Sequence, residues 1–267
     1  MATTTLVAKA QAALEAELQR FVAGDPDRSV AVHVLDGLPL WAEVAAEVVR
    51  PAASFLKLLP ALALYDAAER GEIDLDATVT REELGTTAYP SILAAFQDHR
   101  GLALREVCAF SLMTSDNPAA EYIRRLVGHD RIRRICENLQ LSRTAMIVGF
   151  TDQELGAVGR RNVSTAREAL RIIEHIEASP RLGELRRFLV NNQRNTRIPV
   201  RLEDEIPVMH KTGSLATVVN DVGVIHLPQA RIALAYLCAN ESDTALAGVA
   251  IGDSALRIVE IVSEITT

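Results

Sequence analysis

Ser54 and Lys57 are the first residues along the chain whose types and spacing could do chemistry together. They bound Ser54-Phe55-Leu56-Lys57, which opens a segment of helical periodicity that runs to about Arg70. Residues i and i+3 share a helix face, so the hydroxyl of Ser54 and the amine of Lys57 can touch. A helix N-terminus favours negative charge, and apolar neighbours would lower the pKa of the lysine by desolvation. The pair can therefore act as a nucleophile with its base.

Two later motifs also hold hydroxyl, amide or amine side chains. They are Ser115-Asp116-Asn117 and Lys211-Thr212-Gly213-Ser214. Each motif has an ordinary structural explanation when it is taken alone. A serine often caps a helix, the second motif suits a cap before Pro118, and the third suits an edge strand with a glycine turn. A lone motif therefore leaves a structural and a chemical role open.

Lysine is rare in this chain. Of the 28 basic residues only Lys9, Lys57 and Lys211 are lysines, and the others are arginines. Arginine does not lose its proton near neutral pH, whereas a desolvated lysine can do so and act as a base. Two of the three lysines fall inside the motifs, which indicates a chemical use for them.

Hydrophobic periodicity predicts the elements that must position these motifs. We expect helices over 4–23, 54–70, 104–112, 117–127, 130–138, 164–178, 181–190 and 244–265, and strands over 29–35, 40–44, 208–211, 218–225 and 232–238. Strands near both ends can form one antiparallel sheet only if the middle is a helical insertion. We therefore predict an α+β protein whose single domain, 1–267, has an α+β lobe from about 1–51 and 191–267 and an all-α lobe from about 52–190. The site is expected in the cleft between the lobes.

Composition excludes several classes of function. The net charge of -7 argues against nucleic-acid binding, and no stretch is apolar enough to span a membrane. The N-terminus has no signal-peptide pattern, so we expect a cytoplasmic protein, or a secreted or periplasmic one if a leader was removed. The three cysteines and six histidines lack metal-ligand spacing. We expect no metal, no organic cofactor and a monomer that acts on a small molecule.

The three motifs in this order are the signature of class A β-lactamases and penicillin-binding proteins. The chain resembles class A β-lactamases along nearly its whole length, from SVAVHVLD to HKTGSLATVVNDVGVIHLP. The resemblance implies a β-lactamase/transpeptidase-like two-lobed fold, with an antiparallel sheet flanked by terminal helices plus an all-helical lobe. It also implies that the protein hydrolyses the β-lactam amide of penicillin- or cephalosporin-type substrates through an acyl-enzyme.

The same resemblance assigns a role to each residue of the first two motifs. Ser54 would attack the lactam carbonyl, and Lys57 would help to take its proton. Ser115 would relay a proton to the leaving nitrogen, and Asn117 would orient Lys57 and the substrate.

The third motif would bind the substrate. Lys211 would supply a positive field near Ser115 and the substrate carboxylate. Thr212, Gly213 and Ser214 would form the strand that binds the substrate, and Thr212 and Ser214 would offer hydrogen bonds to it. The main-chain N–H groups of Ser54 and Ser214 would form the oxyanion hole.

One loop departs from the family pattern. The arginine and aspartate whose salt bridge pins this loop in the family fall on Phe150 and Asn162, and an asparagine that holds water falls on Gly156. Asp152 aligns with the glutamate that activates the deacylating water, and Glu154 is the nearest true glutamate. Both could equally be solvated loop carboxylates. Because a displaced base can slow a reaction by orders of magnitude, deacylation is the step that this loop puts in question.

Alternatives to β-lactam hydrolysis follow from this departure. One is a penicillin-binding, D-Ala-D-Ala carboxypeptidase or esterase activity that uses the same nucleophile. Another is a sensor that holds an acyl ligand without turnover. Cys108 matches a position that some family members join by a disulfide to the helix of the nucleophile, but the partner position falls on Ala61, so that bridge cannot form here.

Overall fold

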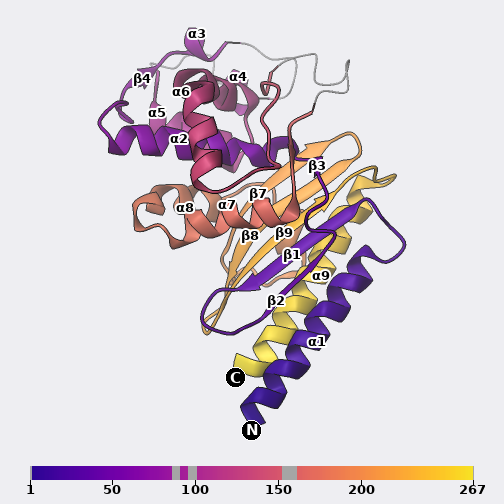
Figure 1. The fold of residues 1–267 in the computed structure, drawn as a ribbon. Helices are drawn as coiled ribbons and strands as arrows, with labels where there is room; N and C mark the ends of the chain where they lie inside the picture. Colours follow the sequence, from indigo (N-terminus) through magenta and orange to yellow (C-terminus); the bar gives the residue numbers. More distant parts are fainter. Residues whose placement is uncertain (1, 86–90, 96–100, 152–160, 267) are drawn as a thin grey trace.

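A five-stranded antiparallel sheet forms the centre of the protein. The computed structural model describes residues 2–85, 91–95, 101–151 and 161–266. The strand order is β2-β1-β9-β8-β7, where β1 is Arg28–Val34, β2 Trp41–Val44, β7 Val208–Leu215, β8 Val218–His226 and β9 Arg231–Cys238. Strands from the two ends of the chain therefore meet, as β1 pairs with β9 (Figure 1). This confirms the predicted α+β class.

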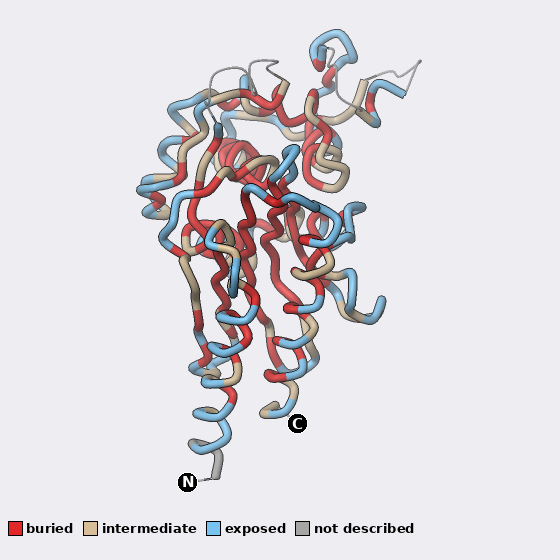
Figure 2. The backbone as a smooth tube through the Cα atoms, turned by 90° about the vertical axis from the view of Figure 1, so that its right-hand side faces the viewer, coloured by how far each residue is buried: buried red, intermediate tan, exposed pale blue. Residues whose placement is uncertain are grey.

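The terminal helices cover one face of the sheet. α1 (Ala2–Val22) and α9 (Thr244–Thr266) lie side by side, and both chain ends lie at the same end of the molecule (Figure 1). Their apolar stripes meet the sheet in one core cluster, in which Phe21 contacts the ring of Tyr236 edge-on at 5.0 Å. The strands are buried along most of their length, whereas buried and exposed residues alternate along the terminal helices (Figure 2). This pattern is typical of amphipathic helices on a buried sheet.

Helices from the middle of the chain form a second core cluster on the other side of the sheet. They are α2 (Leu58–Glu69), α5 (Leu104–Met113), α6 (Asn117–Asn138), α7 (Ala166–Ala178) and α8 (Gly183–Val190). The helices expected over 117–127 and 130–138 both lie within α6, and a kink at Gly128, whose φ of 75° and ψ of 161° are not helical, separates them. Glycine adopts this left-handed conformation without a steric penalty.

Short elements join these layers. They are β3 (Arg50–Pro51), β4 (Thr78–Val79), β5 (Leu102–Ala103), β6 (Val163–Ser164), α3 (Arg81–Leu84), α4 (Ile92–Ala95), and the 3-10 helices η1 (Ala53–Lys57), η3 (Pro180–Leu182) and η4 (Ile198–Arg201). The expected helix over 54–70 is thus a 3-10 turn followed by α2. In the part of the chain that the structure describes, no helix is long and apolar enough to cross a membrane.

Candidate active site

The turn that carries Ser54 is held in an unusual conformation. Ala53 has a φ of 52°, a left-handed value that L-residues rarely adopt and that costs of the order of 1–3 kcal/mol. The buried amide of Asn220 on β8 fixes this turn by donating to the carbonyl oxygens of Pro51 at 2.8 Å and Ala52 at 3.1 Å. Its Oδ1 accepts from the N–H of Cys238 at 3.0 Å. The central strands thereby set the position of Ser54, which stays half-buried.

Lys57 is buried, with 1% of its surface exposed, among uncharged oxygen atoms. Its Nζ donates to Ser115 O at 2.5 Å, to Asn117 Oδ1 at 2.6 Å and to Ser115 Oγ at 3.2 Å. Burial lowers the pKa of Lys57 well below its usual value, and the charge of Lys211 lowers this pKa further. Within the described residues, Lys57 Nζ and Ser54 Oγ form no hydrogen bond, contrary to the contact expected from their spacing. The amine is instead directed toward the second motif.

Ser115 joins the two lysines. Its Oγ accepts from Lys57 at 3.2 Å and from Lys211 at 3.0 Å. Ser115 itself has a φ of 61°, in the tight connection between α5 and α6. Asp116 caps α6 by accepting from Ala119 N at 3.1 Å, so the ordinary helix cap is present alongside the contacts with the lysines.

Lys211 is fully buried on β7, where it also donates to Thr212 O at 2.9 Å. Burial lowers the pKa of Lys211 to about 7. The charges of Arg194 and Arg197 also lower this pKa, whereas the charge of Asp221 raises it. A group with this pKa changes its charge near neutral pH. Lys211 can therefore gain or lose a proton near neutral pH, and it lies close to a second buried amine, Lys57, whose pKa is also lowered.

Strand β7 runs directly beside the Ser54 turn. A Cβ atom at Gly213 would lie 2.7 Å from Ala52 O and 3.2 Å from Phe55 N, so only glycine fits here. Arg197 holds the same stretch of β7 from the other side: its guanidinium donates to Gly213 O at 2.9 Å and to Ser214 Oγ at 2.5 Å. β7 is thus fixed between the Ser54 turn and a buried arginine.

The loop after the 141–148 segment is described only in part. Asp152, Glu154 and Gly156 lie outside the described residues. Phe150 is described, and its ring centroid lies 5.3 Å from Lys57 Nζ. On the described part of the loop, the group that faces Lys57 is therefore an aromatic ring.

The structure places most of the predicted site residues near one another and adds supporting residues around them. The structure brings together Lys57, Ser115, Asn117 and Lys211, with Ser54, Thr212, Gly213 and Ser214 on the adjoining turn and strand. Asn220 and Arg197 were not identified from the sequence, and Phe150 was identified only as the replacement of the family's loop arginine. Asn220 had a signal in the sequence, because a polar pair, Asn220-Asp221, interrupts an otherwise apolar strand.

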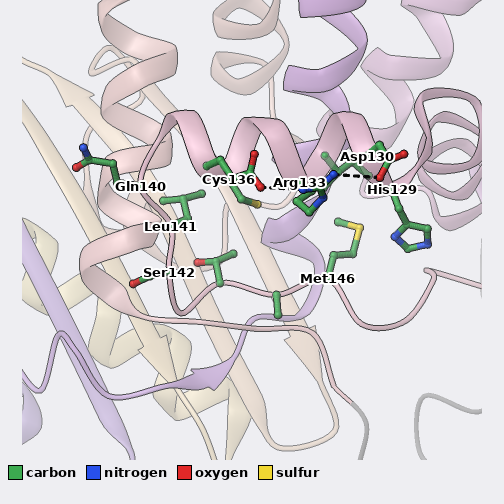
Figure 3. A pocket seen from close by; sticks show the side chains of 12 residues that line it. His129, Asp130, Arg133, Cys136, Gln140, Leu141, Ser142 and Met146 are labelled. Atoms are coloured by element: carbon green, nitrogen blue, oxygen red, sulfur yellow. Dashed lines mark hydrogen bonds and ion pairs between the residues drawn. The ribbon is translucent and has the colours of Figure 1, made fainter.

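A cleft of about 710 Å³ lies elsewhere, between the C-terminal half of α6 and residues 140–146 (Figure 3). Its lining includes Ile132, Cys136, Leu141 and Met146. Burial raises the pKa of the Cys136 thiol to about 11, which makes it a poor nucleophile. No group of metal-ligating side chains occurs among the described residues. The candidate active site is therefore the cluster of buried amines and hydroxyls beside the Ser54 turn, not this cleft.

Comparison with known proteins agrees with this geometry. A family described as the beta-lactamase enzyme family matches residues 13–262. A class A β-lactamase structure from Bacteroides cellulosilyticus DSM 14838 is similar with a TM-score of 0.84 and 20% identity, covering 96% of this chain and 99% of that one. A β-lactamase from Sphaerobacter thermophilus DSM 20745 has a TM-score of 0.82 and 21% identity, with coverage of 95% and 98%. The structure of PBP-A has a TM-score of 0.80 and 22% identity, with coverage of 94% and 96%. A search of curated protein sequences found no match.

The fold is therefore of the class A β-lactamase type, as the three motifs led us to expect. The chain belongs to the beta-lactamase enzyme family, and at that level it is a hydrolase of the β-lactamase type.

Proposed function

We propose that Ser54 is the nucleophile of a serine hydrolase that forms an acyl-enzyme with penicillin- or cephalosporin-type β-lactams. The observation that carries this proposal is the convergence of two buried lysine amines on Ser115 Oγ, at 3.2 Å for Lys57 and 3.0 Å for Lys211. Burying two amines is costly, because charged groups lose their hydration. A protein that needed only stability would have little reason to place them together.

Lys57 acts as the base in this proposal. Burial lowers the pKa of Lys57, which favours the neutral amine, and Lys57 lies one 3-10 turn after Ser54. Ser115 relays a proton to the leaving nitrogen, because its hydroxyl is hydrogen-bonded to both amines. Asn117 orients Lys57 through the 2.6 Å contact of its Oδ1.

The β7 side binds the substrate. β-Lactams of these types carry a carboxylate, and Lys211 and the buried Arg197 make the field around Thr212 and Ser214 positive. The close approach of β7 to the Ser54 turn suits an oxyanion hole formed by the main-chain N–H groups of Ser54 and Ser214. Such a pair of donors stabilises the charge that develops in acyl transfer.

Deacylation has two candidate bases, Asp152 and Glu154, both outside the described residues. The alternative is a penicillin-binding, D-Ala-D-Ala carboxypeptidase or esterase activity, or a sensor without turnover. The position of Phe150 against Lys57 favours slow release of the acyl group. Acylation by a β-lactam is common to the hydrolase and to the penicillin-binding alternative.

Intact-mass spectrometry after mixing with a penicillin tests the proposal. We expect the wild type to gain the mass of the antibiotic, and Ser54→Ala to gain none. Ser179→Ala, which removes a serine between α7 and η3, is the matched control and should behave as the wild type. If the wild type gains no mass and cleaves no chromogenic cephalosporin, the proposal fails, and a screen of ester substrates follows. The lifetime of the adduct distinguishes the alternatives. A lifetime of seconds or less indicates a hydrolase, and a lifetime of hours indicates a penicillin-binding protein or a sensor.

A further inference from the structure

Phe150 is the described residue that faces Lys57 from the loop. Its side chain is 5% exposed, and its ring centroid lies 5.3 Å from Lys57 Nζ. The hydrogen bonds of this amine go to uncharged oxygens of Ser115, Asp116 and Asn117. Among nearby charges, those of Lys211 and Arg194 lower the pKa of Lys57, and the Asp116 carboxylate raises it. An aromatic face attracts an ammonium group much less strongly than a carboxylate at the same place would. The ring also displaces water, which would otherwise stabilise the charged form of the amine.

Glu121 fixes the main chain of Phe150. Its Oε2 accepts from Phe150 N at 2.9 Å, and its carboxylate is paired with Arg124, whose Nη2 lies 2.5 Å from Oε1. Burial pushes the pKa of Glu121 upward, but the hydrogen bonds from Arg124 and Phe150 N lower it below its usual value. Glu121 therefore remains an acceptor at neutral pH, and it does so in a buried position on α6.

Asn162 connects the two ends of the loop by hydrogen bonds, without a salt bridge. Its Oδ1 accepts from Ile147 N at 2.7 Å and from Val148 N at 2.9 Å, and its Nδ2 donates to Val148 O at 3.1 Å. The arginine–aspartate pair of the family is replaced here by side-chain to main-chain hydrogen bonds from a single asparagine. The segment that ends at Phe150 is therefore held in place despite the loss of that pair.

We propose that Phe150 is a positioning residue for the Ser54 acyl-enzyme, whose ring covers the loop side of Lys57 and keeps water from it. This inference rests on the proposed function of Ser54. Acylation forms the bond from Ser54 Oγ to the lactam carbonyl carbon and breaks the C–N bond, and the serine proton ends on the nitrogen. Deacylation consumes one water, which releases the acid and restores the hydroxyl. Phe150 favours the first step, because Lys57 stays an effective base, and slows the second, because water is excluded beside that base.

The test compares Phe150→Ala, Phe150→Leu and Phe150→Glu with the wild type. The rate of acylation by a fluorescent penicillin is measured from pH 5 to 10 by stopped flow, and the adduct lifetime by intact mass. In Phe150→Ala, we expect the acid limb of the acylation profile to move up by about one pH unit, since water reaches the amine. In Phe150→Glu it should move up by about 1–3 units, because an opposite charge stabilises the ammonium. Both variants should shorten the adduct lifetime by about tenfold or more.

Phe150→Leu is the conservative variant, which keeps an apolar side chain at this place and should restore the wild-type pH profile. Thermal melting of each variant shows that it is folded. Folded Ala and Glu variants with unchanged pH profiles and lifetimes would overturn the inference. It would also be overturned if Asp152→Asn or Glu154→Gln lengthened the lifetime while the Phe150 variants did not change it. Absence of an adduct in the wild type would instead refute the proposed function.

Discussion

Replacement of Gly213 by alanine is the sharpest steric test of the site. The added Cβ would lie 2.7 Å from Ala52 O, 3.2 Å from Ala53 Cβ and 3.2 Å from Phe55 N. Non-bonded heavy atoms are normally separated by about 3.5 Å or more, so β7 and the Ser54 turn must move apart by roughly 0.8 Å. The nearest atom is a main-chain oxygen, so rotating a side chain gives no relief.

This displacement should affect both activity and stability. A misplacement of about 1 Å can cost about a hundredfold in rate, so we expect acylation to slow by about 10- to 100-fold. That range corresponds to about 1.4–2.7 kcal/mol of barrier. Overpacking a well-packed site costs about 1–3 kcal/mol of stability, and each kcal/mol lowers the melting temperature by about 2–4 °C for a domain of this size.

Stopped-flow acylation and thermal melting measure the two effects. Gly183→Ala is the matched control, because its Cβ meets only Arg186 Nη2, at an ordinary 3.5 Å. Gly183 begins α8 with a helical φ of −56°, so alanine should leave acylation unchanged and stabilise slightly. If Gly213→Ala acylated and melted as the wild type does, the close contact between β7 and the Ser54 turn would be wrong.

Three further outcomes are expected. Lys57→Arg should form no adduct at any pH up to 9, because a guanidinium does not lose its proton; a fully active variant would contradict the role of Lys57 as the base. With a pKa of about 7, Lys211 is charged below that pH, so KM for carboxylate-bearing substrates should rise as the pH increases through 7. Lys211→Arg should remove this rise, and an unchanged profile would exclude Lys211 as its source. Asn220→Leu removes the hydrogen bonds to Pro51 O and Ala52 O and leaves the Cys238 N–H unpaired, so urea unfolding should show a loss of at least about 3 kcal/mol. A loss below about 1 kcal/mol would show that the turn is held by other contacts.

The helices and strands could be predicted because their signals are local. A helix is predicted by the apolar stripe of residues 4–23, and a strand hairpin by the apolar segments on either side of the Asp36-Gly37 turn. Each signal extends over only a short stretch of sequence. The 3-10 start of the segment at Ser54 was missed, because its geometry depends on Asn220, far away in the chain. The separation of the helices over 117–127 and 130–138 was predicted, and Gly128, whose backbone is not helical, lies between them.

The sequence by itself determined which side chains are available for chemistry. Its scarce lysines and three ordered motifs identified Ser54, Lys57, Ser115 and Lys211 as a set. The type of each residue and the order of the motifs can both be read directly from the chain, without knowledge of the fold.

Only the tertiary structure decided how that set is arranged. The amine of Lys57 points to Ser115 rather than forming a hydrogen bond with Ser54, and Phe150 lies against it. These contacts join residues that are distant in sequence, and they depend on the packing of α6 and on a sheet register that places Asn220 opposite Gly213. Periodicity carries no information on register or packing between distant elements, so these contacts could be found only in the folded chain.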